Sequence, residues 1–590
     1  MIDGFGGTGA GQIPEVTIGP YNNFQPQNIQ NYETEYVGNV TWIKGAHNLR
    51  AGLEVNRQRD NENQEQATFC GYCLGSGGFQ FEQGTTQLNG GPTGNDYNAF
   101  ASFLLGLPEN AGKVTLFPPA YHFYQNIYAF YVRDQWQVNR KLTVTYGTRW
   151  EYFPFATRGS RGLEYLNAPA NQMVVCGVGG NPEDCGITKD SHRFAPRGGI
   201  AYRVTDSTVI RAGYGLSNDP ANYGSDLGNR QNFPDIVATA ITAPNSYSYA
   251  TTLRQGLPAI AQPNYSSGAV NVPLTAGIFT VDNSNYVRGY VQSWNFTVEQ
   301  RIKSWIISAG YVATRSIDPV SALNENWSPV GGGTAGEVLN ALYGRPATTN
   351  MIGTMGTNKY DSLQARAEHR FSGGFYIGAT YTFAKALGYS TQVAIPSDFR
   401  LNYGPLAGIA HHAIGLTWIA DSPFGAGKRY FQSGIRAKAL GGWQLNAVTI
   451  FRTGTPFTVT ASNTSLNASG STQFGDCLSP PHQLGGIYQW YDKSTFGTPS
   501  SGRFGTCGTD NLWGPGLIDM DNSLNRIFQI SERVRMKFSA EGFNIANTPH
   551  HSNPTSSVSS GTFMQALGIA NTGREGIDER TFRLGLRVEW

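Results

Sequence analysis

The sequence predicts an all-β fold, an antiparallel transmembrane β-barrel with long extracellular loops and short periplasmic turns. The last ten residues, Thr581 to Trp590, alternate between apolar residues and polar residues or glycine. Successive side chains of a strand point to opposite faces, so this pattern is typical of a strand with an apolar environment on one face and a polar environment on the other. The same alternation recurs along the chain. No apolar run approaches the roughly 20 residues that a membrane-spanning helix needs.

The composition agrees with a barrel. The 590 residues include 73 Gly, 32 Phe, 30 Tyr and 11 Trp, and 39% of the chain is hydrophobic. Barrel strands need only alternate residues to be apolar, and aromatic girdles mark both interfaces of the membrane. Glycine suits strands that curve and stack closely. The net charge of +2 argues against a nucleic-acid partner bound through a basic surface.

Alternating segments follow one another in pairs joined by short turns. The first pair covers 36–42 and 49–55, and the second covers 128–132 and 142–150. Later pairs turn near 205–207, 301–303, 372–374 and 531–532 and across a longer segment at 421–442. Long polar loops lie near 154–196, 217–287, 315–357, 454–517 and 547–577. Seven pairs and the C-terminal strand predict about 15 strands, or about 17 if 75–117 adds two.

The turns and loops also predict an orientation. Outer-membrane barrels place short turns in the periplasm and long loops outside. The last strand then ends at Trp590 on the periplasmic side, and the first strand, near residue 34, enters from outside. We therefore expect 1–33 to be an irregular extracellular start and 34–590 to be barrel. The odd strand number and a start without the pattern of a signal peptide favour the C-terminal part of a larger barrel.

Six cysteines form three close pairs outside the alternating segments. Local pairs in polar loops predict disulfides made in an oxidising compartment. The pairs are Cys70 with Cys73, Cys176 with Cys185, and Cys477 with Cys507. A redox centre at Cys70 and Cys73 would need a following helix, but a Gly-rich segment follows. A structural zinc site would need a second CxxC or suitably spaced histidines. We therefore expect neither a metal site nor a cofactor.

The sequence does not predict an enzyme. No Gly-x-Ser-x-Gly motif or spaced catalytic pair stands out. His411 and His412, like His550 and His551, are adjacent, and adjacent side chains of an extended segment point apart rather than toward one metal. A soluble β-propeller would need a repeat of roughly 40 to 50 residues, but the spacing of the hairpins is irregular.

From about residue 30 to the end, the chain resembles the barrel of Oar-like TonB-dependent receptors. The motifs that carry the resemblance are TWIKGAHNLRAG at 41–52, ASFLLGLP at 101–108, YVRDQW at 131–136, LTVTYGTR at 142–149, APRGGIAY at 195–202, GWQL at 442–445, RTGTPF at 452–457 and AEGFNIAN at 540–547.

This resemblance implies a 22-stranded barrel in the intact protein, located in the bacterial outer membrane. It implies uptake of a bulky solute, a carbohydrate or a peptide, with energy from TonB and its inner-membrane motor. Members of the family also carry a plug and a carboxypeptidase-regulatory-like domain. We find neither in this sequence, nor a TonB box, so contact with the TonB complex would run only through a missing N-terminal region. The alternative is a plug-less adhesion protein or passive pore built on the same barrel.

The C-terminal strand is also expected to be an assembly signal. Its apolar residues would be read by the barrel assembly machinery, since the strand must close the barrel and an open strand edge cannot lie in hydrocarbon. Members of the family end in the same pattern. The residues of the signal are Phe582, Leu584, Leu586, Val588 and Trp590. We expect Leu584 and Phe538 to face lipid, and Arg583 and Lys537 to face the interior.

Overall fold

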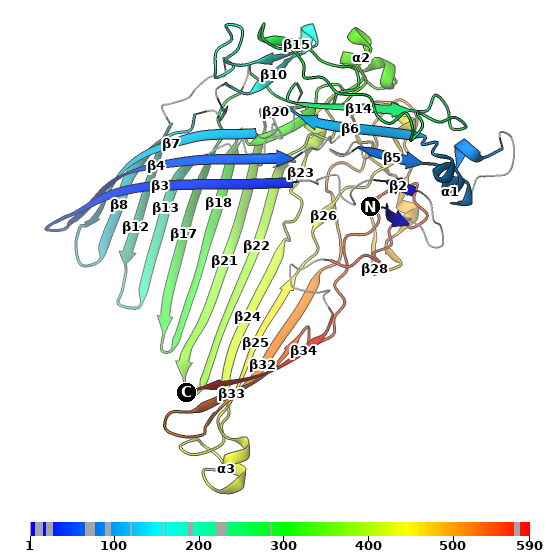
Figure 1. Cartoon of the computed structure of the whole chain (residues 1–590). Coiled ribbons are helices and arrows are strands. Elements are labelled where there is room, and N and C mark those ends of the chain that lie inside the picture. Colours follow the sequence, from blue (N-terminus) through cyan, green and yellow to red (C-terminus); the bar gives the residue numbers. More distant parts are fainter. Residues whose placement is uncertain are drawn as a thin grey trace.

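The computed structural model describes most of the chain. The described residues are 2–5, 16–18, 27–64, 77–88, 96–117, 121–154, 156–159, 161–186, 193–219, 233–283, 286–570 and 579–590. Long strands lie side by side in a curved wall, with loop elements gathered at one end and the C-terminus at the other (Figure 1).

The largest sheet holds 17 strands. Two are short: β9 (Thr157–Arg158) pairs with β7, and β23 (Tyr403–Pro405) pairs with β22. The others follow one another in antiparallel order, which is β3 (Gln27–Lys44), β4 (His47–Gln64), β7 (Tyr121–Gln137), β8 (Leu142–Tyr152), β12 (Arg193–Arg203), β13 (Thr208–Asn218), β17 (Tyr290–Ile302), β18 (Trp305–Ile317), β21 (Thr357–Ser372), β22 (Phe375–Tyr389), β24 (His412–Asp421), β25 (Trp443–Arg452), β32 (Leu517–Gln529), β33 (Arg535–Phe543) and β34 (Thr581–Glu589).

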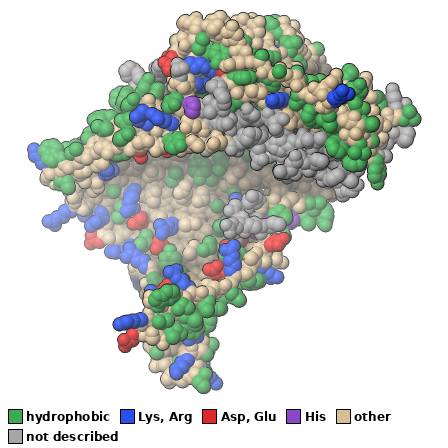
Figure 2. All heavy atoms as spheres, viewed as in Figure 1, with side chains coloured by type: hydrophobic (Ala, Val, Ile, Leu, Met, Phe, Trp, Pro, Cys, Tyr) green, Lys and Arg blue, Asp and Glu red, His purple; other side chains and the backbone are tan. Residues whose placement is uncertain are grey.

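The sheet is an open wall in the described part of the chain. β3 and β34 stand at the two ends of the strand order, and no backbone pairing joins them among the described residues. Figure 2 shows the molecule hollowed between the loop elements and the lower part of the wall, with charged side chains beside the hollow.

The two faces of the wall differ as the alternation predicts. One cross-strand row holds Phe130, Trp150 and Phe194, and the next row holds Glu54, Ala129 and Glu151. We call the face of the first row the apolar face and that of the second the polar face. In a membrane barrel the apolar face meets lipid and the polar face meets the lumen.

Asp134 is a charged residue that breaks the alternation. It lies on the apolar face of β7 but is buried. The Tyr146 hydroxyl donates to Asp134 Oδ2 over 3.0 Å, and His47 Nδ1 lies 2.6 Å from the same oxygen. The His47 ring stacks on Trp136 at 5.4 Å between ring centroids. These neighbours bind one oxygen, Oδ2, of a carboxylate that lipid could not solvate, while the buried Oδ1 has no hydrogen-bond partner among the described residues.

The loop elements form smaller sheets. β1 (Ile2–Phe5), β2 (Val16–Ile18), β5 (Gly78–Phe81), β6 (Asn110–Leu116) and β14 (Ile236–Thr242) form a five-stranded sheet. Two sheets of three strands consist of β10 (Glu164–Asn167), β11 (Gln172–Val175) and β15 (Ala269–Asn271), and of β16 (Ile278–Val281), β20 (Thr349–Thr354) and β19 (Val320–Asn324). Three two-stranded pairs are β26 (Pro456–Phe457) with β31 (Leu512–Trp513), β27 (Asp476–Cys477) with β30 (Phe496–Gly497), and β28 (Gln483–Gly486) with β29 (Gln489–Tyr491).

The helices are short. They are α1 (Asp96–Leu105), α2 (Val338–Tyr343) and α3 (Gly434–Leu440). Within the described ranges, none of the helices has the length and apolar character needed to cross a membrane.

The loops have apolar cores of their own. One cluster gathers Val114, Leu116, Ile236 and the Cys176–Cys185 pair around Phe123 of β7. A second is built on Phe457, Tyr491, Phe496, Leu512 and Phe563. A third includes Met173, Phe233, Ile278 and Leu339. Segments that the sequence shows only as polar loops therefore fold against each other and against the wall.

One expected boundary is wrong, and one alternative that the sequence left open is decided. The first long strand begins at Gln27 rather than near 34, and 1–33 also contains β1 and β2. The strand begins earlier because the polar segment 27–33 pairs with the equally polar segment 58–64. Backbone pairing does not require apolar side chains where a strand continues beyond the membrane into water. The sequence also left open whether 75–117 adds two strands to the wall, and the described residues of this range form β5, α1 and β6, which lie outside the main sheet.

Candidate functional site

A row of arginines crosses the polar face on neighbouring strands. Arg50 of β4 lies opposite Arg133 of β7, Arg133 lies opposite Gly147 of β8, and Gly147 lies opposite Arg197 of β12. The register thus places three guanidinium side chains in one row around the wall. They line a cavity of about 460 Å³.

Two glycines make room for side chains in this row and beside it. A Cβ added to Gly147 would lie 2.7 Å from the Cβ of Arg133 and 2.4 Å from the carbonyl oxygen of Val132. A Cβ added to Gly52 would lie 2.6 Å from the ring of Tyr131. Real Cβ atoms do not approach so closely, so both positions depend on the missing side chain of glycine.

The next rows hold a balanced charge network. Arg149 Nε donates to Glu151 over 2.8 Å, and Arg149 Nη2 donates to Glu54 over 3.0 Å. Asn218 donates to the other oxygen of Glu151 over 3.0 Å. Arg149 therefore has its counter-charge inside the wall.

The arginine row has no such balance. Among the described residues, no carboxylate lies within ion-pair distance of Arg50, Arg133 or Arg197, and the buried Nε of Arg50 has no hydrogen-bond partner. Like charges directly opposite on neighbouring strands destabilise a sheet. An anionic group in the cavity would remove this repulsion, and a guanidinium can donate two parallel hydrogen bonds to a carboxylate or a phosphate.

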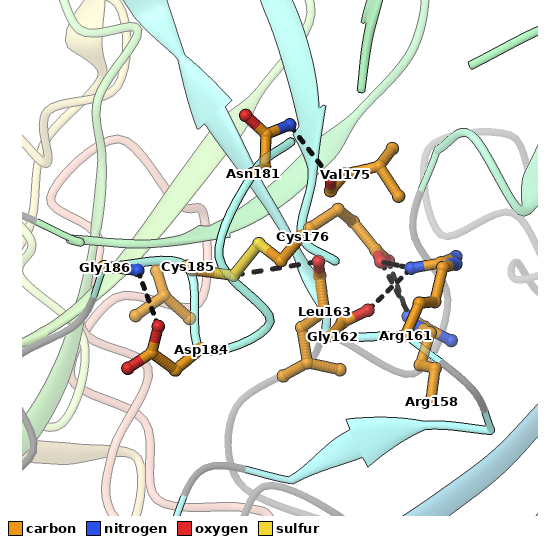
Figure 3. The surroundings of a disulfide bond; sticks show 12 residues. Arg158, Arg161, Gly162, Leu163, Val175, Cys176, Asn181, Asp184, Cys185 and Gly186 are labelled. Carbon is orange, nitrogen blue, oxygen red and sulfur yellow. Dashed lines mark hydrogen bonds and ion pairs between the residues drawn. A yellow bond between two sulfur atoms is a disulfide. The ribbon is translucent and has the colours of Figure 1, made fainter. Parts of the chain in front are cut away.

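We call the small sheets and helices gathered at one end of the long strands the loop domain. A second charged cluster lies there, beside a disulfide (Figure 3). Arg158 Nη2 donates to Glu164 over 2.6 Å, Arg161 Nη1 donates to the same carboxylate over 3.1 Å, and Arg161 also pairs with Asp235. The guanidinium of Arg158 stacks 4.8 Å from the ring centroid of Phe123. This cluster ties the loop domain to β7.

The charges of this cluster are buried. Burial and, after it, the nearby Glu164 carboxylate raise the pKa of Asp235 to about 6, although Arg158 and Arg161 act in the opposite direction. The Asp235 carboxyl therefore titrates in a mildly acidic range. Two acids and two arginines balance one another, so the cluster is a structural clamp rather than an anion site.

The structure joins two of the three expected cysteine pairs. Cys176 is bonded to Cys185 and Cys477 to Cys507, both in the loop region. Beside the second disulfide, Arg503 Nη1 donates to Asp476 over 2.8 Å, and this hydrogen bond lowers the pKa of Asp476. Cys70 and Cys73 lie outside the described residues.

The apolar residues of the expected assembly signal share one face of β34. Leu584 is 79% exposed and pairs with Ala540, and Trp590, just after the strand, is 92% exposed. Arg583 lies on the polar face opposite Glu541. None of these residues lies in the arginine row, which is formed by β4, β7, β8 and β12.

The four histidines of the adjacent pairs lie apart from the arginine row. His412 Nδ1 is 2.9 Å from the Tyr381 hydroxyl, and His550 Nε2 is 2.9 Å from the Ile518 carbonyl oxygen. No cluster of three His, Cys, Asp or Glu side chains suited to a metal ion occurs in the described ranges.

The sequence did not single out the arginine row, although it held a signal. Arg50, Arg133, Arg149 and Arg197 all stand in motifs of the family resemblance and in the polar phase of their strands. Their grouping depends on the register between strands, which a single sequence does not specify.

Comparisons with known proteins place the chain among barrels. A family model described as "outer membrane beta barrel domain" matches residues 2–581. Solved structures similar to the chain include the outer membrane transporter YddB from Escherichia coli, with 11% identity and a TM-score of 0.45 over 95% of this chain and 54% of that chain. The ferric yersiniabactin uptake receptor FyuA from Yersinia pestis has 10% identity and a TM-score of 0.42, over 97% and 54% of the two chains.

A third similar structure is the ferric-catecholate import receptor Fiu from E. coli K12, with 12% identity and a TM-score of 0.43 over 98% of this chain and 59% of that chain. The chain spans about half the length of these solved proteins. No curated protein matches it.

Proposed function

Because the chain belongs to the outer membrane beta barrel domain family and is therefore an outer-membrane protein, we propose that it forms the transport barrel of a TonB-dependent receptor. In this proposal the barrel takes up a bulky solute, a carbohydrate or a peptide, as the resemblance to the Oar-like receptors implies. TonB would supply the energy for uptake. The barrel assembly machinery would insert the protein.

The observation that carries the proposal is the unbalanced arginine row on the polar face. A wall that served only as a scaffold would gain nothing from like charges placed opposite each other on β4 and β7. A lumen through which an anionic group passes, or in which an acidic plug surface sits, supplies the missing negative charge. The loop elements gathered at one end of the strands and held by the ion pairs of Arg158 and Arg161 are where this proposal places the first contact with a solute.

Uptake by cells that make the protein tests this function. Labelled oligosaccharides and peptides, each in neutral and acidic forms, would be compared with and without a working TonB system. We expect uptake to require TonB, and Arg50→Gln/Arg133→Gln to reduce uptake of the acidic forms. The control Arg140→Gln/Lys141→Gln removes the same charge from the exposed turn between β7 and β8, and should have no effect.

Two results would contradict the proposal. Uptake that continues unchanged without TonB would identify a passive pore. Binding of cells to a surface or a partner, with no uptake of any solute, would identify an adhesion protein.

A further inference from the structure

A second cavity opens on the opposite side of the wall from the arginine row. It is about 510 Å³ in volume and lies at the loop end of β3, β4 and β7. Its lining residues include Arg57, Arg59 and His122, with Tyr32, Tyr36 and Tyr124. No residue of the lining is acidic.

The strand register places this cavity on the apolar face. Tyr36 lies opposite Val55, which lies opposite Tyr128, and the same face continues below through Leu53 and Phe130. Burial of the intervening residues supports this assignment. Phe123 and Gln125, which point the other way, are only 5% and 6% exposed beneath the loop domain, whereas His122 is exposed.

The basic residues lie toward the loop end of the strands, just beyond the apolar rows of Leu53 and Val55. Arg57 is one cross-strand row beyond Val55, and Arg59 is two rows beyond it. Each row of two residues rises roughly 5 Å along the membrane normal in a strand tilted by about 40°. The headgroup region is about 5 to 7 Å thick on each side of the hydrocarbon. The two guanidinium groups therefore stand at the level of lipid headgroups and immediately above it.

Local contacts hold these side chains without neutralising them. The guanidinium carbon of Arg59 lies 5.5 Å from the ring centroid of Tyr124, and His122 Nδ1 lies 2.7 Å from Asn61 Oδ1. Within the described part of the chain, Arg57 and Arg59 form no ion pair. A cation stacked on an aromatic ring keeps its N–H groups available to an anion.

We propose that this cavity binds the phosphate groups of a phosphorylated lipid in the outer leaflet. Arg57 and Arg59 donate hydrogen bonds to the phosphate, and the tyrosines pack at the boundary between headgroup and acyl chains. A soluble solute would approach through the lumen, which lies on the other face. The inference rests on the location in the outer membrane and is independent of the transport function.

Native mass spectrometry of the detergent-extracted protein tests this site, with lipid A and enzymatically dephosphorylated lipid A as the probes. We expect the wild type to bind lipid A about tenfold or more tightly than the dephosphorylated form. Arg57→Gln/Arg59→Gln should lose this preference, and Arg57→Lys/Arg59→Lys should keep part of it. The control Arg140→Gln/Lys141→Gln should bind as the wild type does. Heat modifiability in gels checks that each variant is folded.

Three outcomes would overturn the proposal. The first is equal binding of both lipids by the wild type, which decides the question even if the variants do not fold. The second is an unchanged preference in folded Arg57→Gln/Arg59→Gln. The third is binding of inorganic phosphate that competes fully with lipid A, because the cavity would then be a site for soluble anions.

Discussion

Replacement of Leu584 by arginine tests whether β34 spans lipid. The strand has nine residues, and at about 3.3 Å per residue and a tilt of about 40° it spans roughly 23 Å along the membrane normal, close to the apolar band of about 25 Å in such barrels. Leu584 is the fourth residue, within about 3 Å of the midplane. Arginine at this depth costs about 2 to 4 kcal/mol.

The matched change is Arg583→Gln on the other face of the same strand. Arg583 lies opposite Glu541, and its guanidinium is 4.9 Å from the ring centroid of Phe543. Loss of that exposed cation–π contact costs about 0.5 to 1 kcal/mol. We therefore expect Leu584→Arg to lower the free energy of unfolding several times more than Arg583→Gln does.

The assay is reversible urea unfolding of the protein in lipid vesicles, followed by tryptophan fluorescence. The same pair of variants in a detergent micelle serves as a control for the lipid environment. Similar losses of stability for Leu584→Arg and Arg583→Gln in vesicles would refute the assignment of the apolar face to lipid.

Three further predictions concern the loops and the chain end. Cys507→Ser, which opens the 30-residue loop closed by Cys477, should lower the free energy of unfolding by about 3 to 4 kcal/mol in non-reducing unfolding experiments. Because the folded pKa of Asp235 is raised from 3.8 to about 6, its contribution to stability is full below pH 3.8 and is lost as the pH rises through about 6. After correction for the intrinsic rise of amide exchange with pH, protection from hydrogen exchange in the loop domain should fall over this range, and Asp235→Asn should flatten that dependence; an equal dependence in both would contradict it. Deletion of Trp590 should reduce insertion and leave protease-sensitive periplasmic protein, and normal amounts of heat-modifiable barrel in outer-membrane fractions would exclude the signal role.

The sequence by itself determined the strands and their two faces. Alternation is a local property, since a side chain's face follows from its position in the strand. Thr581 to Trp590 therefore indicated both the strand and the side on which Leu584 and Arg583 lie. The sequence also predicted the pairing of Cys176 with Cys185, because these two cysteines are close along the chain.

Only the tertiary structure decided which residues meet across strands. The row of Arg50, Arg133 and Arg197 and the cavity at Arg57 and Arg59 both depend on register, and a shift of one residue would move each side chain to the other face. Register is set by turns and by long-range pairing, which local pattern does not encode. The loop cores could not be predicted for the same reason: one buried cluster brings together Phe123, Ile236 and the Cys176–Cys185 disulfide from segments far apart in the chain, so their burial exists only once the wall has formed.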